Sequence, residues 1–298
     1  MIILFILMLV GFICYKMKLI TDESGKTLSA IVVNIANPAM ILYASMGADV
    51  KIQGAELALT LGIATAMVGS LILVSYLVTV VLRVERKSRG VYHVMTVFSN
   101  IGFMGFPLIS AVFGPGALLY ASLFTIPYNI LIYTYGINSM KNIDAPKEKF
   151  SLGKILNIGV IASIASITIY MLKIPMPKFV IMATQHLSNL TAPLSMIVIG
   201  ASLASIDLKK LFLDARMLAF ALIKLVVIPI VAFLLIRHLI SGEILRGVCL
   251  IMLTMPVGSM TAMLASQYDG DFETATKGVA LTTLLSVVTI PLVSMIFM

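Results

Sequence analysis

The sequence is poor in charged residues, and this shortage decides which class of protein it describes. Asp, Glu, Lys and Arg make up only 11% of the 298 residues, whereas hydrophobic residues make up 60% and the mean hydropathy is +1.08. Soluble domains carry about a quarter charged residues, so we exclude a soluble domain. Alternating strands of about ten residues are also absent, so we expect membrane-spanning helices and not a β-barrel.

Tryptophan is absent and there are only two cysteines. Cys14 and Cys249 both lie in apolar stretches without the spacing of a disulfide or a metal site, so we interpret them as packing residues and expect no metal. The chain also lacks a glycine-rich phosphate loop, an HExxH motif and a nucleophile close to a histidine. We therefore expect neither an enzyme nor a transporter driven by ATP on this chain, and no cofactor.

Ten apolar stretches separate the narrow clusters of charge, and most have the ~20 residues that a helix needs to cross the membrane. They cover residues 2–15, 27–46, 55–82, 90–113, 116–138, 151–172, 178–204, 211–239, 243–268 and 274–297. The sequence therefore predicts an all-α integral membrane protein with ten transmembrane helices.

Lysine and arginine are divided unequally between the two sets of loops. If the N-terminus is outside, fifteen of the 21 fall in inside loops, five fall in outside loops, and Lys224 lies within an apolar stretch. Positively charged short loops stay in the cytoplasm, so we predict a multi-pass protein of the cell membrane with both termini outside. The net charge of +8 then reflects topology, and we expect no nucleic-acid partner.

Three short matches relate the two halves of the chain. The segment YKMKL at 15–19 resembles YMLKI at 170–174, and a proline, Pro38 or Pro193, follows each at the same spacing. The tripeptide RGV then occurs in both halves, at 89–91 and 246–248. Because each half holds an odd number of stretches, the second half has to run with inverted topology. The predicted domains are a first five-helix repeat at 1–138, a cytoplasmic loop at 139–150, and a second, inverted repeat at 151–298.

Helix-breaking residues interrupt four of the apolar stretches at similar depth. They lie in FSNIGFMGFPLIS at 98–110, TMPVGSMT at 254–261, NIANPAM at 34–40 and NLTAPLS at 189–195. In lipid an unpaired backbone group costs several kcal/mol, so a broken helix survives only where protein or a water-filled cavity satisfies it. We therefore predict that the broken fourth and ninth helices cross near the membrane centre and form a cavity.

A helix that breaks and restarts exposes free carbonyls at the end of its first half and free amides at the start of its second. Carboxylates bind the amide end and cations bind the carbonyl end. For any one of these residues a role in helix packing or a simple kink is more common, but the paired clusters at equal depth favour a site. The predicted substrate-binding residues are Asn37, Asn100, Gly102, Phe103, Gly105, Pro107, Pro256, Gly258, Ser259 and Thr261.

No acidic residue is predicted at the membrane centre, which counts against proton coupling through a carboxylate. His186 is the nearest titratable alternative, although a lone histidine more often packs between helices. Lys224 is the only charge deep in a stretch: it either snorkels to the surface or supplies a fixed positive charge to the bundle. Hydroxyls and carbonyls at the breaks leave a sodium site open, but we favour a uniporter driven by the membrane potential.

The acidic cluster Asp269, Asp271 and Glu273 resembles part of a calcium loop but lacks its twelve-residue ligand pattern. We interpret it as a solvated loop that caps the last helix.

Three segments resemble the auxin efflux carrier family. SNIGFMGFPLISAVFGPGALLYASLF at 99–124 resembles its fourth-helix signature, LTMPVGSMTAMLASQYDGDFETATKGVALTTLLSVVTIPL at 253–292 its last two helices, and GFICYKMKLITDESGKTLSAIVVNIANPAMIL at 11–42 also agrees. The resemblance implies two inverted five-helix repeats, crossing broken helices four and nine, and a scaffold of helices one, two, six and seven. It also carries the crossover asparagine onto Asn100 and the ninth-helix break onto Pro256 to Ser259. The short N-terminus and the brief central loop depart from the family pattern.

The resemblance implies a secondary transporter, an efflux carrier or permease, of small organic acid anions: auxin in plant relatives, malonate or malate in bacterial ones. Its expected partners are the anion and the lipid bilayer, and the resemblance allows a homodimer that no stretch of the sequence demonstrates. The alternatives are a cation/proton antiporter and a sodium-coupled symporter with a similar inverted-repeat fold. The missing central aspartates count against the antiporter.

Overall fold

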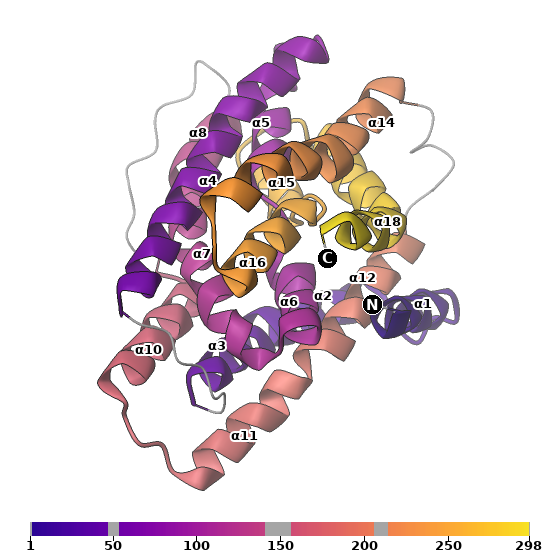
Figure 1. Ribbon diagram of the computed structural model, residues 1–298. Helices are drawn as coiled ribbons and strands as arrows, with labels where there is room; N and C mark the ends of the chain where they lie inside the picture. The colour runs from indigo at the N-terminus through magenta and orange to yellow at the C-terminus, as the bar shows by residue number, and fades with distance from the viewer. Residues whose placement is uncertain (1, 47–53, 141–155, 206–213, 298) are drawn as a thin grey trace.

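The computed structural model describes residues 2–46, 54–140, 156–205 and 214–297 (Figure 1). All regular secondary structure in these ranges is helical, and the one bridge between extended residues joins Ser99 to Val257. Most of the loop predicted at 139–150 lies outside the described residues.

The first half of the chain forms helices that are interrupted by short π-helical and 3₁₀ turns. In order they are α1 (Ile2–Lys16), α2 (Asp22–Ile31), η1 (Val32–Ala36), α3 (Asn37–Met46), α4 (Gly54–Val81), α5 (Arg89–Val97), η2 (Ile101–Gly105), α6 (Phe106–Phe113), η3 (Pro115–Ala117), α7 (Leu118–Leu131), η4 (Ile132–Gly136) and α8 (Ile137–Met140). Within the predicted fourth span, residues 98–100 between α5 and η2 leave the helical path completely, whereas η1 and η4 continue directly from the helices before them.

The second half shows the same pattern of long helices with one complete break. Its helices are α10 (Ile158–Leu172), α11 (Lys178–Asn189), α12 (Thr191–Ala204), α14 (Ala215–Leu222), η5 (Ile223–Val227), α15 (Ile228–Leu239), α16 (Glu243–Thr254), α17 (Met260–Gln267) and α18 (Phe272–Phe297). The break lies between α16 and α17.

Side-chain caps move three helix starts away from the boundaries predicted from hydropathy. The second helix begins at Asp22 and not at residue 27, because Thr21 and Ser24 form a capping box there. Asn157 accepts a hydrogen bond from Val160 N and starts α10, and Asp214 caps α14 in the same way. Apolar patterning cannot locate such starts, since it registers neither the polar first turn of α2 nor a single polar cap such as Asn157 or Asp214.

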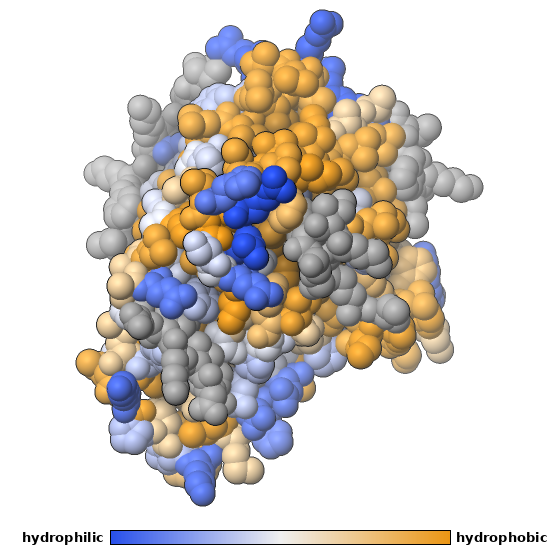
Figure 2. Space-filling view, in the orientation of Figure 1, coloured by the Kyte–Doolittle hydropathy of each residue, from blue (hydrophilic) through white to orange (hydrophobic). Residues whose placement is uncertain are grey.

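Six helical stretches of the described residues are long and apolar enough to cross a membrane. They are Asp22–Met46, Gly54–Val81, Pro115–Met140, Lys178–Ala204, Ala215–Leu239 and Phe272–Val293, and shorter apolar helices cover Ile3–Lys16, Ile101–Phe113 and Ile158–Leu172. Large apolar side chains are also exposed on the outer surface, such as Leu73 at 72% and Phe179 at 74%. Figure 2 shows this hydrophobic surface over much of the molecule. The chain is therefore a multi-pass membrane protein.

One group of helices packs around α1, α3 and α12. Gly11 of α1 and Gly200 of α12 allow the two backbones to touch, since a Cβ on Gly11 would overlap the Ile197 carbonyl and one on Gly200 the Met8 carbonyl. Helices α10 and α11 pack on α3, at the lower part of the view in Figure 1.

A second group surrounds α18. Helices α5, α14, α16 and α17 and the π-helical turn η5 all contact α18, and α4 lies along α5. Gly278 of α18 lies against Met95 of α5, whose sulfur occupies the space that a Cβ would need. Both breaks belong to this second group, so the helices that pack on α18 position the interrupted backbone.

Candidate functional site

The two complete breaks meet and pair with each other. Residues 98–100 and 256–258 run antiparallel: the N–H of Asn100 donates to the Pro256 carbonyl at 2.8 Å, and the N–H of Gly258 donates to the Phe98 carbonyl at 3.0 Å. Buried backbone groups need such partners, and here each interrupted helix supplies them to the other. The predicted meeting of the two interruptions is therefore present in the backbone.

Side chains from two other helices bind two backbone groups that this pairing leaves without a partner. The hydroxyl of Tyr128, on α7, donates to the Ser99 carbonyl at 3.0 Å. The N–H of Val257 donates to the Thr282 hydroxyl of α18 at 3.1 Å. Tyr128 and Thr282 are absent from the residues predicted from sequence, and no local motif marks them, because each acts on a segment of another helix.

Asn100 lies at the start of the second half of the broken fourth helix. Its side chain is 8% exposed, and its Oδ1 accepts a hydrogen bond from the Phe103 N–H at 3.3 Å. This is the geometry of an N-cap, and it explains why the helix restarts at Ile101. The amide end of η2 and α6 thus has a fixed position beside the ninth-helix break.

Asn37 approaches the same amide end from η1 and α3. A Cβ built on Gly102 would lie 3.2 Å from Asn37 Nδ2, and the Asn37 side chain is 7% exposed. Its Oδ1 has no hydrogen-bond partner in the structure, and within the described ranges no hydrogen bond to the Gly102 N–H is found. Asn37, Asn100 and Gly102 therefore gather polar groups around the positive end of a half-helix.

The remaining predicted residues divide between the two sides of the crossing. Gly105 and Pro107 are buried, and a Cβ on Gly105 would make an ordinary contact with Met255 at 3.6 Å. Gly258 lies where the breaks are closest, since a Cβ there would be 3.1 Å from the Ser99 carbonyl oxygen. Ser259, which precedes α17, is exposed, whereas Thr261 of α17 is buried with an unpartnered hydroxyl.

Lys224 reaches the carbonyl end of the fourth-helix break. It lies in η5, its side chain is fully buried, and its ammonium donates to the Thr96 carbonyl and to Ser99 Oγ, both at 2.8 Å. Thr96 is in the last turn of α5, where the carbonyls carry a partial negative charge. The side chain therefore faces the bundle and does not snorkel to the surface, which decides between the two interpretations of Lys224.

The structure places His186 away from this site. It is exposed in the last turn of α11, so it is not brought together with the residues at the breaks. A different histidine is buried: His93 of α5, whose Nδ1 lies 2.8 Å from Ser75 Oγ of α4. Because Ser75 donates its own hydrogen to the Ile72 carbonyl at 2.6 Å, Nδ1 of His93 is the donor in this bond.

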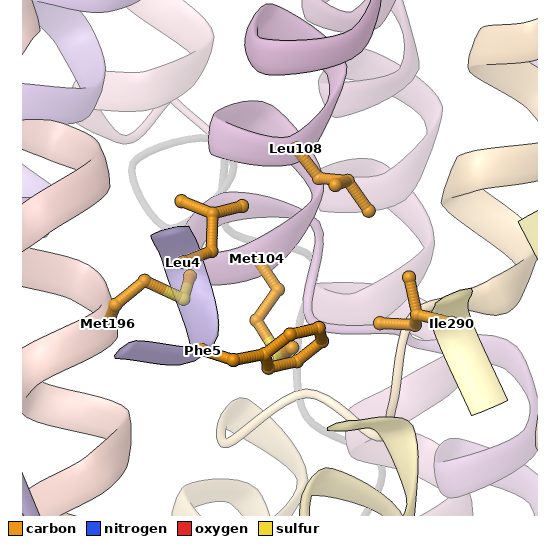
Figure 3. A pocket seen from close by; sticks show the side chains of 6 residues that line it. All are labelled: Leu4, Phe5, Met104, Leu108, Met196 and Ile290. Carbon is orange, nitrogen blue, oxygen red and sulfur yellow. The ribbon is translucent and has the colours of Figure 1, made fainter. Parts of the chain in front are cut away.

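A small apolar pocket adjoins the second half-helix. Figure 3 shows its lining side chains, which come from α1, η2, α6, α12 and α18: Leu4, Phe5, Met104, Leu108, Met196 and Ile290. Met104 belongs to the same turn as Gly102 and Gly105, so the pocket lies beside the contact between α12 and the broken helix. Among the described residues, no cluster of three His, Cys, Asp or Glu side chains could hold a metal ion.

Comparisons with known proteins point to one functional class. A family model described as "Membrane transport protein" matches residues 1–294. An uncharacterized transporter of Methanocaldococcus jannaschii is 26% identical over 97% of this chain and 95% of its own length. An uncharacterized transporter of Methanothermobacter thermautotrophicus is 23% identical over 98% of this chain and 95% of its own length.

Proposed function

This chain belongs to the membrane transport protein family, that of the auxin efflux carriers, and on that premise we propose that it is a secondary carrier of small organic acid anions. In this proposal the carboxylate binds at the crossing of the two broken helices. The carrier then exposes the crossing to each side of the membrane in turn.

The amide end of the second half-helix is the observation that carries this proposal. A carboxylate is stabilised by backbone N–H groups at a helix start and by the partial positive charge there. The amide of Asn37 lies beside Gly102 at this end, since a Cβ on Gly102 would be 3.2 Å from Asn37 Nδ2, and Asn100 holds the first turn in place. These groups recognise an anion by hydrogen bonds without a fixed charge that would bind it too tightly to release.

The charges around the crossing also favour an anion. Lys224 is the only charged side chain that is buried among the described residues, and no buried Asp or Glu accompanies it. A cation/proton antiporter needs a carboxylate that binds and releases cations within the membrane. An anion carrier requires none, so the charge distribution supports the leading candidate over the antiporter.

The packing of the helices supports movement of one group against the other. Helix α1 packs on α12, α11 packs on both α3 and α12, and α10 packs on α3; the apolar pocket lies between α1, α12, α18 and the broken helix. Apolar contacts such as those that line this pocket are suited to a sliding boundary. We propose that the group around α18 moves with the crossing, in a ten-helix inverted repeat whose two termini lie outside.

Uptake into proteoliposomes tests the proposed function. Radiolabelled malonate, malate and indole-acetate are offered under an imposed potential, with and without sodium or proton gradients, to wild type and to Asn100→Ala. We expect saturable uptake of at least one acid, driven by the potential and lost in Asn100→Ala. Cation exchange without uptake of any acid would contradict the proposal and favour the antiporter.

A further inference from the structure

Lys224 combines complete burial with a polar environment that contains no opposite charge. Its side chain is 0% exposed, and none of the ion pairs found in the described part of the chain involves it. Moving an isolated ammonium out of water is costly unless oxygen atoms take the place of its hydration shell. Two oxygen atoms, Thr96 O and Ser99 Oγ, do so at 2.8 Å each.

These two oxygens are of the kind that bind metal cations in broken-helix carriers. A carbonyl at the end of a half-helix carries part of the helix dipole, and hydroxyl and carbonyl oxygens are the ligands that hard cations prefer. Thr96 and Ser99 lie on the two sides of the point where α5 ends at Val97. The ammonium therefore takes the place at the break that a monovalent cation would otherwise take.

The geometry also argues against Lys224 as a direct ligand of the substrate. Its hydrogen bonds point to the last turn of α5 and to Ser99, and no part of the side chain is exposed. The amide end that faces Asn37 and Gly102 is the opposite end of the break. At the fourth-helix break, the Lys224 ammonium thus occupies the carbonyl end, and the amide end remains available for an anion.

We propose that Lys224 replaces the coupling cation of this carrier, so that transport requires no sodium, and that removal of the side chain opens a site for a monovalent cation. The proposal rests on the proposed function and extends it, because it states which cation occupies the same crossing and that no sodium gradient drives transport. Lys224→Ala leaves the Thr96 carbonyl and Ser99 Oγ facing an empty space at the negative end of α5. A sodium ion in that space restores the lost charge and both contacts.

Thermal unfolding of purified protein tests the inference without any knowledge of the substrate. Wild type, Lys224→Ala and Lys224→Met are compared in choline chloride, sodium chloride and potassium chloride at equal ionic strength. The methionine variant is the matched control, because its uncharged side chain fills the lysine path as far as the position of Cε, one atom short of Nζ. We expect sodium to raise the Tm of Lys224→Ala saturably, by a few degrees, and to leave wild type and Lys224→Met unchanged.

Binding of ²²Na⁺ and uptake measurements complete the test. We expect Lys224→Ala, but not wild type, to bind sodium, and any acid uptake by wild type to be equal in sodium and choline. A Lys224→Ala protein that folds but has the same Tm in all three salts would overturn the inference. If that variant does not fold, wild-type binding or uptake that requires sodium would overturn it, and sodium-independent uptake would support it. If Lys224→Ala binds sodium but wild type takes up none of the acids, the proposed function is rejected and the cation site at the break is retained.

Discussion

The two breaks that meet at the centre of the protein are built differently. In the fourth helix, Asn100 caps the second half by its side chain and Lys224 binds the carbonyl end of the first half. In the ninth helix, Ser259 makes no side-chain cap, and the backbone of Pro256 and Gly258 pairs with the other break. The difference indicates that the fourth-helix break holds the charged and amide chemistry, whereas the ninth-helix break mainly supplies backbone partners.

A substitution at Gly258, where the two breaks are closest, should disturb both breaks at once. In Gly258→Ala the new Cβ lies 3.1 Å from the Ser99 oxygen and 3.3 Å from the Phe98 oxygen, and Tyr128 holds Ser99 in place. We expect a loss of about 1–3 kcal/mol in stability and loss of uptake, measured by thermal unfolding and in proteoliposomes. Gly62→Ala, with open space around the new Cβ, is the control; equal stability of the two variants would contradict this account.

The side-chain caps of the two breaks allow a direct comparison. Asn100→Ala removes the hydrogen bond to the Phe103 N–H, so we expect about 1 kcal/mol of lost stability and at least a tenfold decrease in uptake. Ser259→Ala removes no cap and should keep uptake within about twofold of wild type. Similar losses in both variants would show that the two breaks share the chemistry.

A third and smaller effect is expected outside the breaks, where Asp271 caps α18. Its carboxylate accepts hydrogen bonds from the Ser88 hydroxyl at 2.6 Å and from the Thr274 N–H and hydroxyl. Partial burial acts to raise the pKa of Asp271, but these hydrogen bonds outweigh it and hold the pKa below its ordinary value. Because the pKa of Asp271 is lower in the folded than in the unfolded protein, its charged form stabilises the fold at pH values above the unfolded pKa. This stabilisation is lost as the pH falls through the folded pKa.

Asp271→Asn should therefore reduce the dependence of the Tm on pH in the acidic range and cost about 1 kcal/mol or less at neutral pH. Uptake of the organic acid at neutral pH should not change, because Asp271 lies just before α18 and contacts Ser88 just before α5, away from both breaks. Unfolding curves of both proteins from neutral to acidic pH provide the measurement. A mutant that keeps the full acid sensitivity of wild type would show that another group is responsible.

The helical class and the two complete breaks are predictable from the sequence, because they depend on local composition. Long apolar stretches specify helices in lipid, and Gly, Pro and Asn inside them interrupt the ladder of hydrogen bonds. The cap of α18 by Asp271 is also confirmed. Helix starts were less predictable, since Thr21 begins a helix through a polar capping box that hydropathy does not register.

The contacts that complete the site could not be predicted, because they join helices that are distant in the sequence. Tyr128 and Thr282 act on residues of other helices, and no motif near either residue announces this role. Lys224 was recognisable as a charge in an apolar stretch, but its direction depends on how η5 packs against α16 and α18. The same holds for Asn37, whose approach to Gly102 is a matter of tertiary packing.

The most direct test of the anion site compares the KM for acid uptake in wild type, Gly102→Ala and Gly105→Ala. A Cβ on Gly102 lies 3.2 Å from Asn37 Nδ2, at the proposed carboxylate position, whereas the nearest atom to a Cβ on Gly105 is at 3.5 Å, an ordinary contact. The account predicts that Gly102→Ala raises the KM about tenfold, equivalent to about 1.4 kcal/mol of binding, while Gly105→Ala leaves it within about twofold. An unchanged KM in Gly102→Ala, with saturable uptake, would contradict the claim that the anion binds at this end of the broken helix.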